Sequence, residues 1–385
     1  MVTNAVFAAL VAFAVAVVLT PLVARLAVHL HAVDDVKERG LARDHTPLLG
    51  GLAIFAGALA AGLLFLPDNQ RTEGILAAAA LITIVGALDD IYDLHPALKL
   101  GGQVAAAVVL VTSGVVVDTF TLPFVHRVVL GDLGGPLTAF GLVLLMNVVN
   151  FSDGVDGLAA GVCSISAAAF SIIAFDLGRT TAGVLAAIVC GAALGFLLFN
   201  FHPASVFMGD CGSNLLGLLL GAVIVEGTLK TNALIALVGP LVVLAVPFLD
   251  TSFVVAKRIK YRRPIYRGDS NHFHHRFHRI GFSQRRSVLY LYAWTLVMAG
   301  DAVALRFIPY SQSSGHLNLG WAALMAGLLA IGVAASAYLV YVLEILKLRR
   351  LRAWQLRRAD PATSEHEIDA EVERELETGE FRSLA

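Results

Sequence analysis

Charged side chains are scarce in this 385-residue sequence, because Asp, Glu, Lys and Arg together make up only 15% of it. A typical soluble domain carries about 25% charged residues. Hydrophobic residues reach 57%, and they gather in solid runs of about 20 residues, the length that a helix needs to span a bilayer core. The shortage of charge excludes an ordinary soluble domain, and the unbroken runs exclude the alternating pattern of a membrane β-barrel.

The sequence also has few cysteines and almost no net charge, and each of these features argues against a class of site or partner. Cys163, Cys190 and Cys211 show no paired or metal-ligand spacing, so the sequence predicts neither a disulfide framework nor a zinc site. A formal net charge of −1 indicates no nucleic-acid partner. The first run, 4–24, has no basic residues before it, as a signal peptide would, and we interpret it as a retained first helix.

We therefore expect an all-α, polytopic membrane protein with about eleven transmembrane helices. The expected spans are 4–28, 47–66, 73–91, 97–117, 136–151, 157–175, 181–200, 213–228, 233–256, 287–308 and 319–346. Their alternation puts on one face the loops 29–46, 92–96, 152–156, 201–212 and 257–286 and the segment after 346. The opposite face receives the loops 67–72, 118–135, 176–180, 229–232 and 309–318.

The positive-inside rule assigns these two faces. Ten Lys or Arg residues lie in 257–286 and eight lie after 346, whereas the loops of the opposite face hold four. The first face is therefore expected to be cytoplasmic, with the N-terminus outside and the C-terminus in the cytoplasm. The expected domains are a transmembrane domain over 1–346 and a charged, non-catalytic cytoplasmic tail over 347–385.

Four unusual polar clusters fall on the face that is expected to be cytoplasmic. The first is Asp89-Asp90-Ile-Tyr-Asp93, at the end of the third span. Adjacent carboxylates beside hydrocarbon are costly to desolvate and favour the binding of a cation or a proton, although a solvated helix end is the alternative. Lys99 follows at the start of the next span, where it either pairs with these acids or holds a phosphate.

The second and third clusters combine acids with glycines. In Asn150-Phe-Ser-Asp153-Gly-Val-Asp156-Gly157, the glycines allow a tight turn and a close approach to a ligand, although such turns are common without one. Phe207-Met-Gly209-Asp210-Cys-Gly212-Ser213-Asn214 precedes an apolar helix, whose N-terminus favours anions. A carboxylate there can hold Mg²⁺, and an ordinary helix cap by Asp210 or Ser213 is the alternative.

The fourth cluster is His272-Phe-His274-His275-Arg276-Phe-His278, which contains four of the twelve histidines. Histidine and arginine together favour pyrophosphate recognition. A transition-metal site and a merely basic interfacial loop are the alternatives, but the His-Glu-x-x-His pattern is absent. Taken together, the clusters favour metal-assisted phosphoryl transfer between a polar donor and a lipid-anchored acceptor.

In order, spacing and sidedness the four motifs, with His45-Thr-Pro47-Leu-Leu-Gly50-Gly51, resemble those of the MraY/WecA family of polyprenyl-phosphate N-acetylhexosamine-1-phosphate transferases (glycosyltransferase family 4). The resemblance extends from about residue 30 to residue 286. It implies that a UDP-N-acetylhexosamine gives its sugar-1-phosphate to a polyprenyl (undecaprenyl or decaprenyl) phosphate, that UMP leaves, and that Mg²⁺, or Mn²⁺ in its place, is required. The implied location is the bacterial inner membrane, with the site facing the cytoplasm.

The resemblance also implies roles for individual residues. Catalytic roles are expected for Asp89, Asp90 and Asp210, and metal binding for Asp210 and Asp153. Substrate contacts are expected for Lys99, Asn150, Asp153, Asp156, Phe207, His272, His274, His275 and Arg276. Asp89 would activate or position the lipid phosphate, and Phe207 would stack on the uracil. A covalent aspartyl intermediate and direct attack by the lipid phosphate both remain open.

The last motif indicates the subgroup. Asn271-His-Phe-His-His-Arg276 differs from the Pro-Ile-His-His-His-type stretch of the peptidoglycan enzymes and resembles the WecA/TagO-like subgroup, which starts O-antigen, teichoic acid or arabinogalactan-type polymers. UDP-GlcNAc is therefore the expected donor, in the first membrane step of cell-envelope polysaccharide synthesis. UDP-MurNAc-pentapeptide and other UDP-HexNAc donors are alternatives, and so is a cation-coupled transporter that uses intramembrane acids such as Asp301. A homodimer is expected only by analogy.

Overall fold

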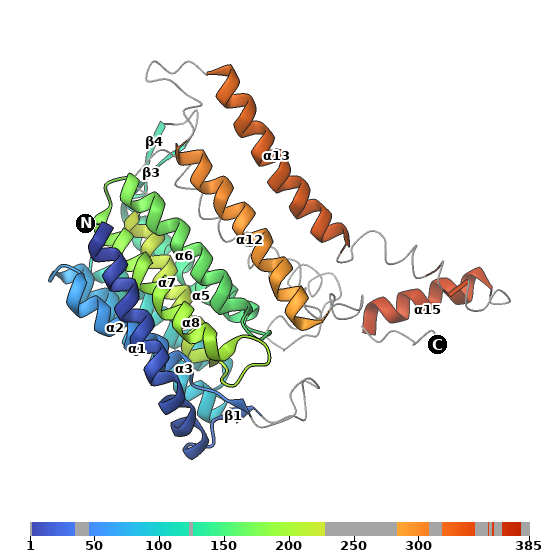
Figure 1. Ribbon diagram of the computed structural model, residues 1–385, viewed down its shortest axis with the longest axis horizontal. Coiled ribbons are helices and arrows are strands. Elements are labelled where there is room, and N and C mark those ends of the chain that lie inside the picture. Colours follow the sequence, from blue (N-terminus) through green and yellow to red (C-terminus); the bar gives the residue numbers. More distant parts are fainter. Residues whose placement is uncertain are drawn as a thin grey trace.

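The structure is a computed structural model that describes residues 2–34, 46–122, 126–227, 283–307, 318–342, 353, 356–357 and 364–378. Its helices are α1 (Val2–His29), α2 (Gly51–Phe65), α3 (Gln70–Tyr92), α4 (Pro96–Thr112), α5 (Gly134–Ser152), α6 (Leu158–Asp176), α7 (Thr180–Asn200), α8 (Gly209–Gly227), α12 (Gln284–Phe307), α13 (Leu319–Val342) and α15 (Glu365–Thr378). Helices α1–α8 form one bundle, α12 packs on α6, and α13 lies beyond α12 (Figure 1).

Two short antiparallel pairs accompany the helices. Strand β1 (Val33–Asp34) pairs with β2 (Thr46–Pro47), and β3 (Thr119–Leu122) pairs with β4 (His126–Val129). A short 3-10 helix, η1 (Gly131–Leu133), leads into α5. The protein is thus helical in its architecture, and its strands are confined to the connections between helices.

The expectation of a multi-pass, helical membrane protein is confirmed. Seven helical segments in the described part of the chain are long and apolar enough to cross a membrane: α1, α3, α5 with η1, α6, α7, α8 and α12. Every expected span except 233–256 coincides with one of the helices α1–α8, α12 and α13. Span 233–256 lies outside the described residues, so the count of eleven and the placement of the termini stay predictions.

Two of the differences from the expected spans lie at the start of α8 and in the connection before α5. Helix α8 begins at Gly209 rather than at 213, so Asp210 lies in the first helical turn instead of at the end of a loop. The connection 118–135 contains the β3–β4 hairpin and η1 rather than irregular chain alone. Both differences have one cause. Polar residues and glycines mark where an apolar run ends, but they do not indicate whether regular backbone hydrogen bonding continues into the adjacent connection.

Local sequence signals set a tight turn between α3 and α4. Helix α3 is capped at its other end by the side chain of Asn69, which accepts a hydrogen bond from the Thr72 N–H at 3.0 Å. At the turn itself, Asp93 is the C-terminal cap of α3 and has a left-handed backbone with φ +51°. His95 caps α4 through its Nδ1, and Pro96 occupies the first turn, where its missing N–H costs nothing. The short turn folds α4 back along α3.

Small residues let α1 and α7 pack closely. Ala5, Ala8 and Ala12 are buried on one face of α1. On α7, a Cβ added at Gly191 would lie 2.1 Å from the carbonyl oxygen of Ala9, so the two backbones are in contact there. Close backbone approach through small residues is the usual way in which helices associate in lipid, where apolar burial alone provides little driving force.

Helix α8 occupies the centre of the bundle. Every residue from Cys211 to Val225 is buried, and the helix packs against α2, α3, α5, α6 and α7. A Cβ at Gly86 of α3 would lie 2.4 Å from the Cα of Cys211, and a Cβ at Gly51 of α2 would lie 2.1 Å from the Gly212 nitrogen. The ends of α2 and α3 therefore meet the first turn of α8, where the acidic motifs gather.

Candidate active site

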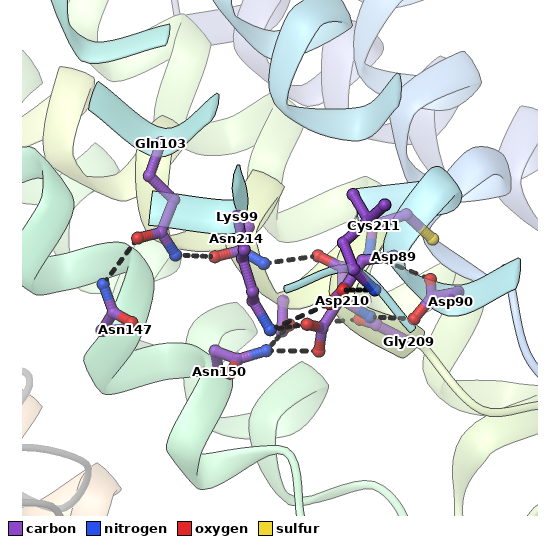
Figure 2. Close-up of polar contacts among 12 residues, drawn as sticks. Asp89, Asp90, Lys99, Gln103, Asn147, Asn150, Gly209, Asp210, Cys211 and Asn214 are labelled. Atoms are coloured by element: carbon purple, nitrogen blue, oxygen red, sulfur yellow. Dashed lines mark hydrogen bonds and ion pairs between the residues drawn. The ribbon is translucent and has the colours of Figure 1, made fainter. Parts of the chain in front are cut away.

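A lysine between two carboxylates forms the centre of the site (Figure 2). The Nζ of Lys99, on α4, lies 3.2 Å from Asp89 Oδ2 on α3 and makes a direct ion pair with Asp210 Oδ2 on α8. The side chains of Lys99, Asp89 and Asp210 are 23%, 11% and 24% exposed, respectively. Three charged groups from three helices thus converge, and each of them keeps part of its side chain exposed.

Hydrogen bonds from α5 fix the second oxygen of Asp210. The Nδ2 of Asn150 donates to Asp210 Oδ1 at 2.6 Å and to Ser213 Oγ at 2.9 Å. Ser213 in turn donates to the carbonyl oxygen of Gly209 at 3.1 Å. The Asp210 carboxylate therefore has one oxygen on an amide and the other on an ammonium, which fixes the plane of the group.

Asp90 has a different environment from its neighbour Asp89. Its Oδ1 accepts a hydrogen bond from the Asp210 N–H at 2.7 Å, and its Oδ2 accepts one from the Cys211 N–H at 3.1 Å. Asp90 therefore caps α8 from another helix, satisfying N–H groups that have no partner within the helix and complementing the helix dipole. Asp89 instead accepts from the Leu94 N–H at 2.9 Å and faces Lys99.

Gly209 permits this cap. Its φ is +72°, a left-handed conformation that L residues rarely adopt. A Cβ on Gly209 would also lie 2.4 Å from Asp90 Oδ2. The glycine of the Met-Gly-Asp motif is thus required both by its backbone angle and by the close approach of the capping carboxylate.

The Pro-Leu-Leu-Gly-Gly signature at the start of α2 supports the segment before α8. The Phe207 N–H donates to the carbonyl oxygen of Pro47 at 2.8 Å. In return, the Gly50 and Gly51 N–H groups donate to the carbonyl oxygens of Phe207 and Met208 at 3.0 and 2.9 Å. These bonds fix the chain that leads to Asp210. The Phe207 side chain is half-buried, and its stacking on uracil stays a prediction.

Asp156 lies in a second set of contacts, after α5. Its Oδ2 is 2.7 Å from His202 Nδ1 and accepts a hydrogen bond from the Ala204 N–H at 3.1 Å. Beside it, the Gly157 N–H donates to Asn200 Oδ1 at 3.0 Å. The Asp156 carboxylate is therefore anchored to the segment that joins α7 and α8.

Helix α12 packs against the residues around Asp156. The hydroxyl of Tyr292 donates to the carbonyl oxygen of Gly157 at 2.5 Å, and Arg285 Nε donates to the carbonyl oxygen of His202 at 2.9 Å. A Cβ at Gly161 would lie 2.1 Å from the Tyr292 ring. Sequence reasoning missed His202, Tyr292 and Arg285. A His-Pro pair shortly before the Met-Gly-Asp motif was the only signal for the first, and the other two lie at the start of a distant helix.

For the remaining expected site residues, the structure shows fewer contacts or does not describe them. Asp153 lies at the end of α5, where its N–H donates to the carbonyl oxygen of Asn150 at 3.1 Å. His272, His274, His275 and Arg276 lie outside the described residues. Within the described ranges, no group of three or more His, Cys, Asp or Glu side chains is arranged to hold a metal ion.

Comparison with known proteins gives consistent results. Residues 73–228 match Glycosyl transferase family 4. The chain is 36% identical over 306 residues to a probable undecaprenyl-phosphate N-acetylglucosaminyl 1-phosphate transferase of Bacillus subtilis, covering 78% of this chain and 85% of that protein. It is 37% identical to a decaprenyl-phosphate N-acetylglucosaminephosphotransferase of Mycobacterium leprae, over 78% of this chain and 83% of that protein.

A second kind of relative is nearly as similar. The chain is 35% identical to a phospho-N-acetylmuramoyl-pentapeptide-transferase of Desulforudis audaxviator, over 76% of this chain and 95% of that protein. The region matched to each of these relatives includes most of the chain, and the convergent acids and the capped α8 lie on the motifs that suggested the resemblance. The chain belongs to the MraY/WecA family of polyprenyl-phosphate N-acetylhexosamine-1-phosphate transferases.

Proposed function

We propose that this protein transfers N-acetylglucosamine-1-phosphate from UDP-GlcNAc to a polyprenyl phosphate and releases UMP. The observation that carries the proposal is the convergence of Asp89, Lys99 and Asp210 at the end of an apolar helix bundle. Such a site offers an ammonium to phosphates and carboxylates to a metal, next to the hydrocarbon in which a polyprenyl chain dissolves. The names of the relatives in Bacillus subtilis and Mycobacterium leprae support the donor and the acceptor.

The reaction needs positioning more than it needs a strong base. An oxygen of the lipid phosphate attacks the phosphorus that carries the sugar, and the bond from that phosphorus to the bridging oxygen breaks. UMP leaves with the bridging oxygen, and the sugar-1-phosphate remains on the lipid as a diphosphate. The attacking phosphate is already an oxyanion at neutral pH, so we favour direct attack over a covalent aspartyl intermediate. In this scheme Asp89 positions the lipid phosphate, and Lys99 neutralises phosphate charge.

A divalent cation is proposed at the same place. The Asp89 and Asp210 carboxylates converge on one ammonium, so the charge arrangement already favours a cation between helix ends. Mg²⁺ commonly binds through one or two carboxylates and completes its shell with waters and substrate phosphates. We propose Asp210 as its principal ligand and Asp153 as a second ligand, with Mn²⁺ as a substitute. When bound, the cation supplies neutralisation of the charge on the diphosphate.

The nucleotide is proposed to lie toward the second set of contacts. Asp156 is held by His202 and by the Ala204 N–H, which leaves its Oδ1 as the acceptor to offer to a hydroxyl or a uracil N–H. Further proposed substrate contacts are Asn150, Asp153, Phe207, His272, His274, His275 and Arg276. A nucleotide donor is available only in the cytoplasm, so we also propose that this end of the bundle faces the cytoplasm, in the bacterial plasma membrane.

Purified protein with UDP-GlcNAc, undecaprenyl phosphate and Mg²⁺ tests the proposal. We expect UMP release that requires both the lipid and the metal. Absence of UMP with every UDP-HexNAc supplied, although the protein is folded, would reject the transferase. A cation-coupled transporter would instead give substrate flux in proteoliposomes without a lipid product.

A further inference from the structure

A row of three side-chain amides lies one helical turn deeper than the charged site (Figure 2). Gln103 follows Lys99 by four residues on α4, Asn214 follows Asp210 by four residues on α8, and Asn147 precedes Asn150 by three residues on α5. Residues three or four apart lie on the same face of a helix. Each of the three site residues from these helices therefore has an amide beneath it.

The three amides form one continuous chain of hydrogen bonds. Asn147 Nδ2 donates to Gln103 Oε1 at 2.8 Å, and Gln103 Nε2 donates to Asn214 Oδ1 at 2.7 Å. Asn214 Nδ2 then donates to the backbone carbonyl oxygen of Asp210 at 2.8 Å. The chain runs in one direction, from α5 through α4 to α8, and it ends on the backbone of the proposed metal ligand.

Burial makes this arrangement specific. Gln103 and Asn214 are each 1% exposed, so their amides have no water to replace a lost partner. An unpaired amide in such a place is costly, which means that the three helices must keep the relative positions that join all three groups. Apolar contacts between helices would not by themselves fix how far one helix is shifted along another, since such contacts tolerate sliding.

We infer that Gln103, Asn147 and Asn214 are positioning residues that set the mutual placement of Lys99, Asn150 and Asp210, and that the proposed transfer depends on this amide layer. The catalytic part of the inference rests on the proposed function. The link between the amides and the charged residues is the bond from Asn214 to the backbone carbonyl of Asp210, and none of the three amides hydrogen-bonds to a charged side chain in the described part of the chain. The layer therefore acts by fixing the positions of the helices.

Two single variants and their combination test the inference. Gln103→Leu and Asn214→Leu each leave a buried amide without its partner, so each should lower the midpoint of thermal unfolding. The double variant removes both amides, while Asn147 Nδ2 keeps its bond to the carbonyl oxygen of Val143 at 2.8 Å. Much of the loss should therefore be recovered, because no buried amide is left without a partner. Its kcat should nevertheless stay reduced, by roughly 10- to 100-fold with little change in KM, since the Asp210 turn is no longer held.

A second readout does not depend on turnover. The Lys99 Nζ is ion-paired with the Asp89 and Asp210 carboxylates. Acylation of Lys99 by a small amine-reactive acylating reagent, followed by mass spectrometry, should therefore be slow in the native protein. In the double variant it should be several-fold faster. Thr20→Val is the matched control, because it removes a buried hydrogen bond on α1, far along the chain from the site, and it should leave Lys99 acylation and kcat unchanged.

The outcomes separate the two proposals. Faster Lys99 acylation in the double variant, with no UMP from the native protein, would support the amide layer and reject the transferase. An active native protein whose double variant keeps both its kcat and its slow Lys99 acylation would overturn the amide layer and leave the transferase standing. A loss of stability alone, without either change, would also overturn it.

Discussion

Two adjacent aspartates in this site have different tasks, although they are chemically identical. Asp90 places both of its oxygens on backbone N–H groups of α8, whereas Asp89 faces the ammonium of Lys99. The difference arises because successive residues on a helix point about 100° apart, so only one of the pair can point at the end of α8. Asp90 therefore caps α8, and the catalytic role expected for it stays a prediction, whereas Asp89 is the carboxylate that we propose to position the lipid phosphate.

Replacing these aspartates separately tests that division. Asp90→Asn should lower the free energy of unfolding by about 1 kcal/mol, because the new NH₂ group opposes an N–H donor of α8. Asp89→Asn should leave thermal stability nearly unchanged and reduce kcat. Thermal unfolding and UMP release, measured on both variants, provide the comparison. Equal loss of stability in the two would contradict the division of tasks.

Asp210 is the residue on which the proposed metal requirement depends. Asp210→Asn keeps the shape and one oxygen but removes the negative charge, so the Mg²⁺-dependent kcat should fall by about 100-fold or more. Activity is measured across a range of Mg²⁺ and Mn²⁺ concentrations. Unaltered activity and metal dependence in this variant would remove Asp210 from its proposed role. Thr20→Val is again the control variant, because it changes a buried side chain that has no proposed role in the reaction.

At the scale of elements, the sequence predicted which helices carry the site but not how they touch. Apolar runs and helix-end signals were sufficient to place Asp89, Lys99 and Asp210 on the same face of the membrane, at or next to the ends of predicted spans. The cap from Asp90 could not be predicted, because it depends on the contact between Gly86 and Cys211, which are distant in the chain. The Asp156–His202 contact was missed for the same reason.

The amide layer shows a second limit of sequence reasoning. Gln103 and Asn147 each lie inside apolar runs, where a single amide gives no indication of its partner. Only the packing of α4, α5 and α8 reveals that they form one chain with Asn214. An isolated amide in an otherwise apolar span is still a usable signal, since it is costly in hydrocarbon unless it is paired.

The packing of α1 on α7 gives a prediction at the same scale. Gly191→Leu would force a side chain into the space that the Ala9 backbone occupies, so it should destabilise the protein by about 1–3 kcal/mol or displace α1. Leu198→Ile, on the same helix but 63% exposed, is the matched control. Thermal unfolding in detergent measures both. A Gly191→Leu protein as stable as the control would show that this contact does not hold α1.

At the scale of the whole molecule, the proposed orientation places all catalytic motifs on the cytoplasmic face. The turn between α2 and α3 then faces outward, and the segment between α7 and α8 faces inward. In a Cys190→Ala background, an Asp68→Cys variant should react in intact cells with a thiol reagent that does not cross membranes, because Asp68 is exposed in the first of these connections.

Ser205→Cys is the partner variant for the other face. Ser205 is exposed between α7 and α8, so it should react with the same reagent only after the cells are permeabilised. Cys163 and Cys211 are buried in both variants and should stay unlabelled. The reverse pattern, with Ser205→Cys labelled from outside, would invert the orientation and place the site where nucleotide sugars are not supplied.

The identity of the donor distinguishes this protein within its family, because the family includes both N-acetylglucosamine-1-phosphate and phospho-N-acetylmuramoyl-pentapeptide transferases. Mass spectrometry of the lipid made from an equal mixture of UDP-sugars, undecaprenyl phosphate and Mg²⁺ tests it most directly. We expect undecaprenyl-diphosphate-GlcNAc together with an equal amount of UMP. A lipid that carries only phospho-MurNAc-pentapeptide, or no glycolipid at all, would contradict it.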